Sequence, residues 1–162
     1  MTKITDKLID KLKLENLNIE NLKKVINFEP QSNQEWVLND QLDAIDLLGY
    51  TASKDALNFL QKIYQPYVVV KQGVGRRDQF GVAKKEINLI QHYYYLSAKG
   101  PLANALHFEI PLFKGTKRHL KQLKPPNELE TEQRTLIGKS VAHVTLRKAL
   151  GRLERSVFSH QE

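Results

Sequence analysis

LDAIDLLGYTASKDALNFLQKIY, residues Leu42–Tyr64, is the stretch that decides which fold the sequence predicts. Apolar residues recur at helical spacing on both sides of Gly49, which predicts two short amphipathic helices joined by a tight turn. Gly49 stands where a left-handed C-terminal cap is expected, and Ser53 is a suitable N-cap for the second helix. Because helices this short are not stable alone, we expect them to pack on each other and on neighbouring helices.

Helical spacing extends beyond this pair in both directions. The first helix of the pair is expected to span about Asn33 to Leu48, and Pro66 closes the second. Residues 4–28 also follow a helical period, with a break near 16–18 and with Asn18 or Asn21 as the cap of a helix that starts near Ile19. The sequence therefore begins with helices.

A fainter copy of the pair follows about 45 residues later, where Ser53–Leu57 aligns with Ala98–Leu102. A period of this size is typical of two-helix repeats, so helix pairs are expected near residues 33–66, 84–111 and 128–158. Residues 67–82 interrupt the pattern, because Val68–Val70 favour extended backbone and three glycines disfavour a helix. We expect a small hairpin or a long ordered loop there.

The order of helix, small-residue turn and helix resembles HEAT-type helical repeats. The residues that carry the resemblance are Ala44–Gly49 at the end of the first helix and Asp55–Leu60 in the second. The resemblance implies an all-α fold: a short right-handed helical-repeat solenoid over residues 1–162, with one Gly/Arg-rich hairpin or loop insertion. It also implies a scaffold that binds a protein partner and offers no shared catalytic residues.

Positive charge is concentrated in the middle of the chain. The net charge is +7, and residues 68–125 contribute +8 from 11 basic and 3 acidic residues, against −2 for residues 1–67 and +1 for residues 126–162. Such clustering favours a polyanionic partner, although a basic face also serves solubility alone. The candidate binding residues for a partner or a polyanion are Arg76, Arg77, Lys84, Lys85, Lys117, Arg118 and Lys121.

No catalytic or metal-binding signature stands out. The chain has no cysteine, which excludes thiolate metal sites and fits a reducing compartment, so a cytoplasmic location is expected. Gly138-Lys139-Ser140 resembles the end of a phosphate-binding P-loop but lacks the glycine five residues earlier. The five histidines have no i, i+4 spacing, and we expect no metal, no cofactor and no catalytic residue.

Two hypotheses from different classes follow. The first is a non-enzymatic, HEAT-like interaction or scaffold module that binds a protein partner. The alternative is a nucleic-acid-binding helical domain that uses the central basic patch. An enzyme with a site assembled from distant residues is a third reading, which a single sequence does not reveal.

Overall fold

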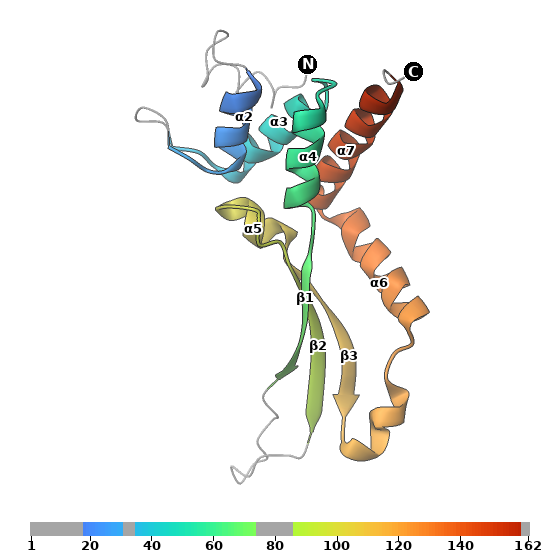
Figure 1. Cartoon of the computed structure of the whole chain (residues 1–162). Helices are drawn as coiled ribbons and strands as arrows, with labels where there is room; N and C mark the ends of the chain where they lie inside the picture. The colour runs from blue at the N-terminus through green and yellow to red at the C-terminus, as the bar shows by residue number, and fades with distance from the viewer. Residues whose placement is uncertain (1–17, 31–34, 74–85, 160–162) are drawn as a thin grey trace. The chain divides into compact units, whose positions relative to one another are not determined.

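The structure is a computed structural model that describes residues 18–30, 35–73 and 86–159. About 59% of these residues are helical and 18% are in strands. A three-stranded antiparallel sheet occupies the middle of the chain (Figure 1). The predicted all-α solenoid is therefore wrong, and the fold is a mixture of helices and a small sheet.

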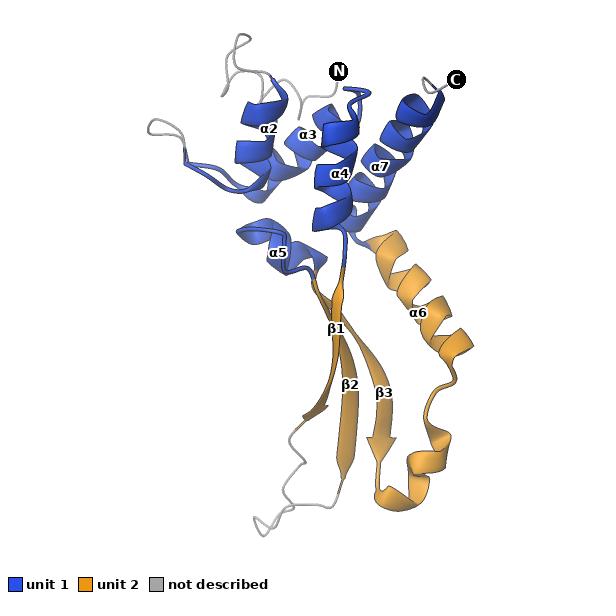
Figure 2. Cartoon of the chain, in the orientation of Figure 1, with its two compact units in different colours: residues 1–65, 95–106, 140–162 blue, residues 66–94, 107–139 orange. Residues whose placement is uncertain are grey.

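The chain forms two compact units, each built from separate segments (Figure 2). Unit 1 comprises residues 1–65, 95–106 and 140–162, and unit 2 comprises residues 66–94 and 107–139. Unit 1 contains helices only among its described residues, whereas unit 2 holds the whole sheet. Charge and candidate chemistry can therefore be assigned to each unit separately.

Unit 1 is a helical core. In it, α3 packs against α2 and α7, and both α4 and α5 also contact α7. Its helices are α2 (Ile19–Ile26), α3 (Leu38–Leu48), α4 (Lys54–Ile63), α5 (Pro101–Leu106) and α7 (Val141–Ser159).

Side-chain caps fix two of these helix starts where the sequence predicts them. The Asn18 side chain accepts a hydrogen bond from the Asn21 N–H at 2.8 Å, at the start of α2. The Ser53 hydroxyl accepts one from the Ala56 N–H at 3.2 Å, at the start of α4. Each cap satisfies an amide that the first helical turn leaves without a partner.

Gly49 follows α3 without the predicted left-handed cap. Its φ of −60° and ψ of −20° are right-handed helical values. Glycine is needed for a different reason, because a Cβ atom at this position would lie 3.0 Å from the Cα of Ala149 on α7. The glycine therefore allows α3 and α7 to approach closely.

Gln41 is a fully buried polar residue that joins three segments of unit 1. Its amide nitrogen donates to the carbonyl oxygens of Ile26 and Lys99, each at 2.8 Å, and its oxygen accepts from the Leu102 N–H at 3.1 Å. A buried amide is tolerated only when its hydrogen bonds are made, and here both ends of the side chain are satisfied. Gln41 thus ties α2 and α5 to α3.

Unit 2 is built on the sheet. Strand β2 lies between β1 and β3 and pairs antiparallel with both, with His92 opposite Val69 on one side and Glu109 on the other. Both α6 and the 3₁₀-helix η2 pack against β3. The elements are β1 (Tyr67–Gly73), β2 (Ile87–Tyr94), β3 (Phe108–Gly115), η2 (Lys117–Gln122) and α6 (Pro126–Lys139).

The predicted helix pair at residues 84–111 is wrong. Residues Ile87–Tyr94 form a strand, and α5 ends at Leu106 instead of continuing to about Glu109. Strand β1 explains the first difference, because an extended segment needs a partner for its backbone groups and β2 supplies it. The early end of α5 follows from β3, which begins at Phe108. Pro111 fits in β3 because this is an edge strand and the proline lies next to a register shift, where the missing N–H is tolerated.

The third predicted helix pair is present as two helices, α6 and α7, which fall into different units. Along the chain, α6 ends at Lys139 and α7 begins at Val141, with Ser140 between them. None of the helices in the described ranges is long and apolar enough to cross a membrane.

Candidate functional site

Net positive charge belongs almost entirely to unit 2. Its residues include 12 Lys or Arg and 6 Asp or Glu, a net charge of +6, whereas unit 1 has 13 basic and 12 acidic residues, a net charge of +1. The contrast is smaller than between the sequence segments above, because Lys99 belongs to unit 1 and residues 126–139, which include three glutamates, belong to unit 2. A field of one sign on one unit attracts anionic partners to that unit.

Three of the seven predicted binding residues are described, and the structure brings them together. Lys117, Arg118 and Lys121 lie on η2, and all three are exposed. The sequence predicts a short helix here, and the structure has a 3₁₀-helix, in which residues three apart lie on the same side, as Arg118 and Lys121 do. Arg76, Arg77, Lys84 and Lys85 lie outside the described residues.

A hollow of about 920 Å³ lies beside this basic segment. It is bounded by the end of β1, the start of β2 and the start of η2. Two cationic side chains and one imidazole line it, together with one carboxylate and several uncharged groups. The lining includes Gln72, Glu86, Ile87, Lys117, Arg118 and His119.

One face of the sheet carries aromatic and basic side chains together. Tyr67 and Tyr94 are direct partners across β1 and β2, so their side chains lie on the same face. The Tyr67 side chain is exposed, and the Lys71 ammonium donates a hydrogen bond to the Tyr94 hydroxyl at 2.6 Å. The ammonium also lies 4.9 Å from the centre of the Tyr94 ring, within the range of a cation–π interaction.

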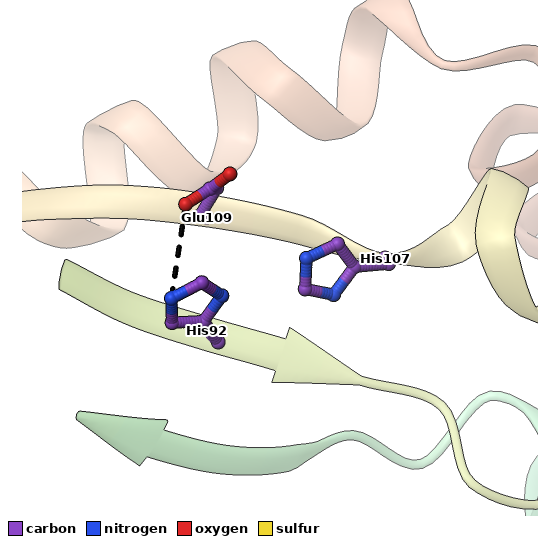
Figure 3. Close-up of side chains that lie close together, drawn as sticks. All are labelled: His92, His107 and Glu109. Atoms are coloured by element: carbon purple, nitrogen blue, oxygen red, sulfur yellow. Dashed lines mark ion pairs between the residues drawn. The ribbon is translucent and has the colours of Figure 1, made fainter. Parts of the chain in front are cut away.

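A second cluster lies on this face at the end of β2 and the start of β3. His92 on β2 is directly opposite Glu109 on β3, and His107 precedes Glu109 by two residues. The three side chains converge (Figure 3), and one potential metal-binding atom from each lies within 4.8 Å of the other two. The His92 and His107 rings stack at 5.5 Å, and the His107 ring stacks on Tyr94 at 4.6 Å.

The hydrogen bonds of the two histidines differ. The Nδ1 atom of His107 lies 3.2 Å from the Tyr93 carbonyl oxygen, so Nδ1 is the protonated nitrogen because a carbonyl only accepts. The lone pair of neutral His107 is then on Nε2. Within the described residues His92 makes no hydrogen bond: its Nε2 is 3.7 Å from a Glu109 carboxylate oxygen, and its Nδ1 is buried without a partner.

Comparison of the chain with protein-family models, with curated proteins and with solved structures found no match in any of the three. Function therefore has to be inferred from the residues themselves. The described residues of unit 2 carry the basic segment on η2, the exposed side chains of β1, and the cluster of His92, His107 and Glu109.

A buried polar cluster in unit 1 has a structural role instead. His143 is 1% exposed; its Nε2 donates to the Leu106 carbonyl at 2.7 Å, and its Nδ1 accepts from the Tyr64 hydroxyl at 2.8 Å. Burial lowers the pKa of His143 below its ordinary value, assisted by the positive charge of Arg147, and burial raises the pKa of Tyr64. Both groups are held neutral, and both hydrogen bonds of the imidazole are used within the core.

Sequence reasoning missed the cluster of His92, His107 and Glu109. The separation of 15 residues between the histidines fits no metal-binding spacing on a helix, and Ile87–Tyr94 is wrongly predicted as helical. The signal that finds the cluster is strand alternation: His107 and Glu109 are two residues apart, so they share a face once this segment is extended.

Proposed function

We propose that unit 2 binds a polyanion, and that this polyanion is a nucleic acid. The observation that carries the proposal is the division of charge: unit 2 has a net charge of +6 and unit 1 of +1. A nucleic acid is a dense line of phosphates, and cationic side chains that displace its counterions supply most of its non-specific binding energy.

The exposed cations of η2 provide the phosphate contacts. Lys117, Arg118 and Lys121 lie within two turns of a 3₁₀-helix, and two of them line the hollow beside β1 and β2. No acidic residue interrupts the segment Lys114–Lys124. Arginine additionally binds phosphate oxygens through two N–H groups at once, which a lysine ammonium does not do.

The aromatic face of the sheet favours unpaired bases as part of the ligand. Tyr67 is more than half exposed, at 55%, and its partner Tyr94 lies next to the Lys71 ammonium. Proteins that bind single strands combine a basic groove with exposed aromatic rings on which bases stack. We therefore expect tighter binding to single-stranded than to double-stranded nucleic acid.

Fluorescence anisotropy with mixed-sequence oligonucleotides tests this proposal. The charge-reversed variant Lys117→Glu/Arg118→Glu/Lys121→Glu should bind at least about tenfold more weakly than the wild type at low salt. It should also show a shallower dependence of affinity on salt, by about 0.7 in logarithmic slope for each single-strand phosphate that the variant no longer neutralises.

A charge-matched control separates a local site from general attraction. Lys62, Lys148 and Arg155 are exposed residues of unit 1 and match the η2 triple in having two lysines and one arginine. Their reversal to glutamate should change affinity much less than reversal of the η2 triple. Absence of binding at low salt, or equal losses in both triple variants, would show that η2 is not a nucleic-acid site.

A protein partner is a second candidate, and strand β1 favours it. In the described sheet β1 pairs on one side only, with β2, and it exposes Val68 by 41% and Val70 by 54%. An exposed edge strand with apolar side chains accepts an added strand from a partner. Peptide selection on the immobilised full chain should then enrich extended apolar segments, and Val70→Lys should reduce their binding. Selection of peptides without apolar alternation would argue against this mode.

A cytoplasmic location is part of the same proposal. The chain has no cysteine, which fits a reducing compartment, and the described helices include none suited to crossing a membrane.

A further inference from the structure

We propose that His92, His107 and Glu109 bind a divalent transition-metal ion such as Zn²⁺. This inference does not depend on nucleic-acid binding. It rests on three ligand groups that meet on one face of the sheet in unit 2 (Figure 3). The spacing of the histidines along the chain predicts no metal site. Sequence spacing alone, however, does not show which residues become neighbours when two strands pair.

The backbone fixes where the ligands stand. Residues directly opposite in an antiparallel pair place their side chains side by side, and His92 has this relation to Glu109. His107 lies two residues before Glu109 and projects to the same face. Metal-to-ligand distances of about 2.0–2.2 Å in a tetrahedral site place the ligand atoms about 3.3–3.6 Å apart, so binding requires side-chain rotations that close the present limit of 4.8 Å.

Both histidines have a nitrogen available for the ion. The hydrogen bond from His107 Nδ1 to the Tyr93 carbonyl is the contact that orients a metal-binding imidazole and leaves its Nε2 lone pair for the metal. Neither nitrogen of His92 makes a hydrogen bond to the described residues, and its Nδ1 is buried. A buried nitrogen without a partner is unfavourable; coordination through Nδ1 would give it one, whereas coordination through Nε2 would not.

The ligand set selects the class of ion. Two imidazoles and one carboxylate suit Zn²⁺ and neighbouring first-row ions better than Ca²⁺ or Mg²⁺, which prefer oxygen ligands only. Three protein ligands leave at least one coordination position open. The Glu109 side chain is 52% exposed, so solvent reaches the site and water can fill that position.

Isothermal titration of the metal-free full chain with ZnCl₂ tests the proposal. We expect one Zn²⁺ per chain, because the three ligand groups form a single cluster. His92→Gln and Glu109→Gln should each weaken binding at least about tenfold. Co²⁺ in place of Zn²⁺ should give a d–d absorption spectrum that both variants lose.

His119→Gln is the matched control, because His119 is an exposed histidine of the same unit outside the cluster. It should bind Zn²⁺ as tightly as the wild type. Glu109 is exposed, so Glu109→Gln should leave the circular dichroism and the unfolding midpoint unchanged. Weaker Zn²⁺ binding by this variant would then be due to the lost carboxylate and not to unfolding. Failure to bind Zn²⁺, or wild-type affinity in Glu109→Gln and His92→Gln, would overturn the proposal, as would an equal loss in His119→Gln.

Discussion

Unit 1 and unit 2 differ in how many of their large side chains are buried and in the charge that they carry. Ten of the eleven largest fully buried side chains belong to unit 1, and Ile110 of β3 is the single one in unit 2 among the described residues. Unit 2 instead holds the excess of positive charge and the cluster of His92, His107 and Glu109. This contrast supports the proposal that unit 1 is the framework and unit 2 is the binding part.

The two units also differ in whether their buried polar atoms have hydrogen-bond partners. In unit 1 the buried polar side chains of Gln41 and His143 use their hydrogen-bonding atoms on backbone groups and on Tyr64. In the described part of unit 2 two buried side-chain atoms, Asn88 Oδ1 and His92 Nδ1, have no hydrogen-bond partner. Native proteins rarely leave such atoms unsatisfied, and at His92 the proposed ion would supply the missing partner if it bound Nδ1.

Truncation of the core should show the largest difference between the units. Leu60 on α4 is fully buried, so Leu60→Ala should reduce the free energy of unfolding by about 2–5 kcal/mol through reduced burial and the cavity left behind. Leu120 on η2 is 37% exposed, and Leu120→Ala should cost less than about 1 kcal/mol. Urea unfolding measures both, and equal losses would contradict the assignment of the framework to unit 1.

Removal of the buried amide should have the next largest effect. Gln41→Leu leaves two carbonyl oxygens and one amide N–H of unit 1 without their partner, and each such group costs about 1–3 kcal/mol when water cannot replace it. Gln72→Leu on exposed β1 is the control and should be nearly neutral. Comparison of the two urea midpoints decides whether Gln41 joins the helices as described.

The pH dependence of stability should include a contribution from the buried His143. Since burial lowers its folded-state pKa, the unfolded chain takes up the proton first as pH falls below about 6.5. Stability is therefore fully present above that pH and decreases as pH falls toward the folded-state pKa. Unfolding midpoints between about pH 5 and pH 8 should depend less on pH in His143→Gln than in the wild type.

If His143→Gln kept the pH dependence of the wild type, the buried imidazole would not be the group that titrates.

Surface ion pairs should show the smallest effects and no difference between the units. Arg152 bonds Asp46 at 2.8 Å in unit 1, and Lys124 is paired with Glu132 in unit 2, with all four side chains about one-third exposed. Double-mutant cycles should give about 0.2–1 kcal/mol for each pair, decreasing with added salt. A coupling energy well above that range in either pair would show that the ion pair stabilises the fold more than its exposure to solvent predicts.

The helices of unit 1 are the part of the fold that local sequence predicts well. Asn18 and Ser53 act as caps where their positions indicate, because capping depends only on the next three residues. The helical spacing of apolar residues in α4 likewise reports the face that meets the core. Gly49 shows the limit of this reasoning, since its role depends on Ala149, a hundred residues further along the chain.

Strand β1 lies where Val68–Val70 predict extended backbone, whereas β2 and β3 were missed because their pairing is not local. Residues Ile87–Tyr94 contain a spacing compatible with a helix, and only the strands on both sides decide that they are extended. For the same reason the candidate site was only partly predicted: Lys117, Arg118 and Lys121 are close in sequence, whereas His92 and Glu109 meet only through the register of β2 and β3.

By itself, the sequence determined the charge, the N-cap at Ser53 and the basic segment of this protein, because composition and neighbouring residues suffice for these. Tertiary structure alone decided that the middle of the chain is a sheet, that the excess charge belongs to one unit, and that two histidines and a glutamate face each other. Those properties depend on contacts between residues far apart in the chain, and strand register, unlike helical period, is set by the partner.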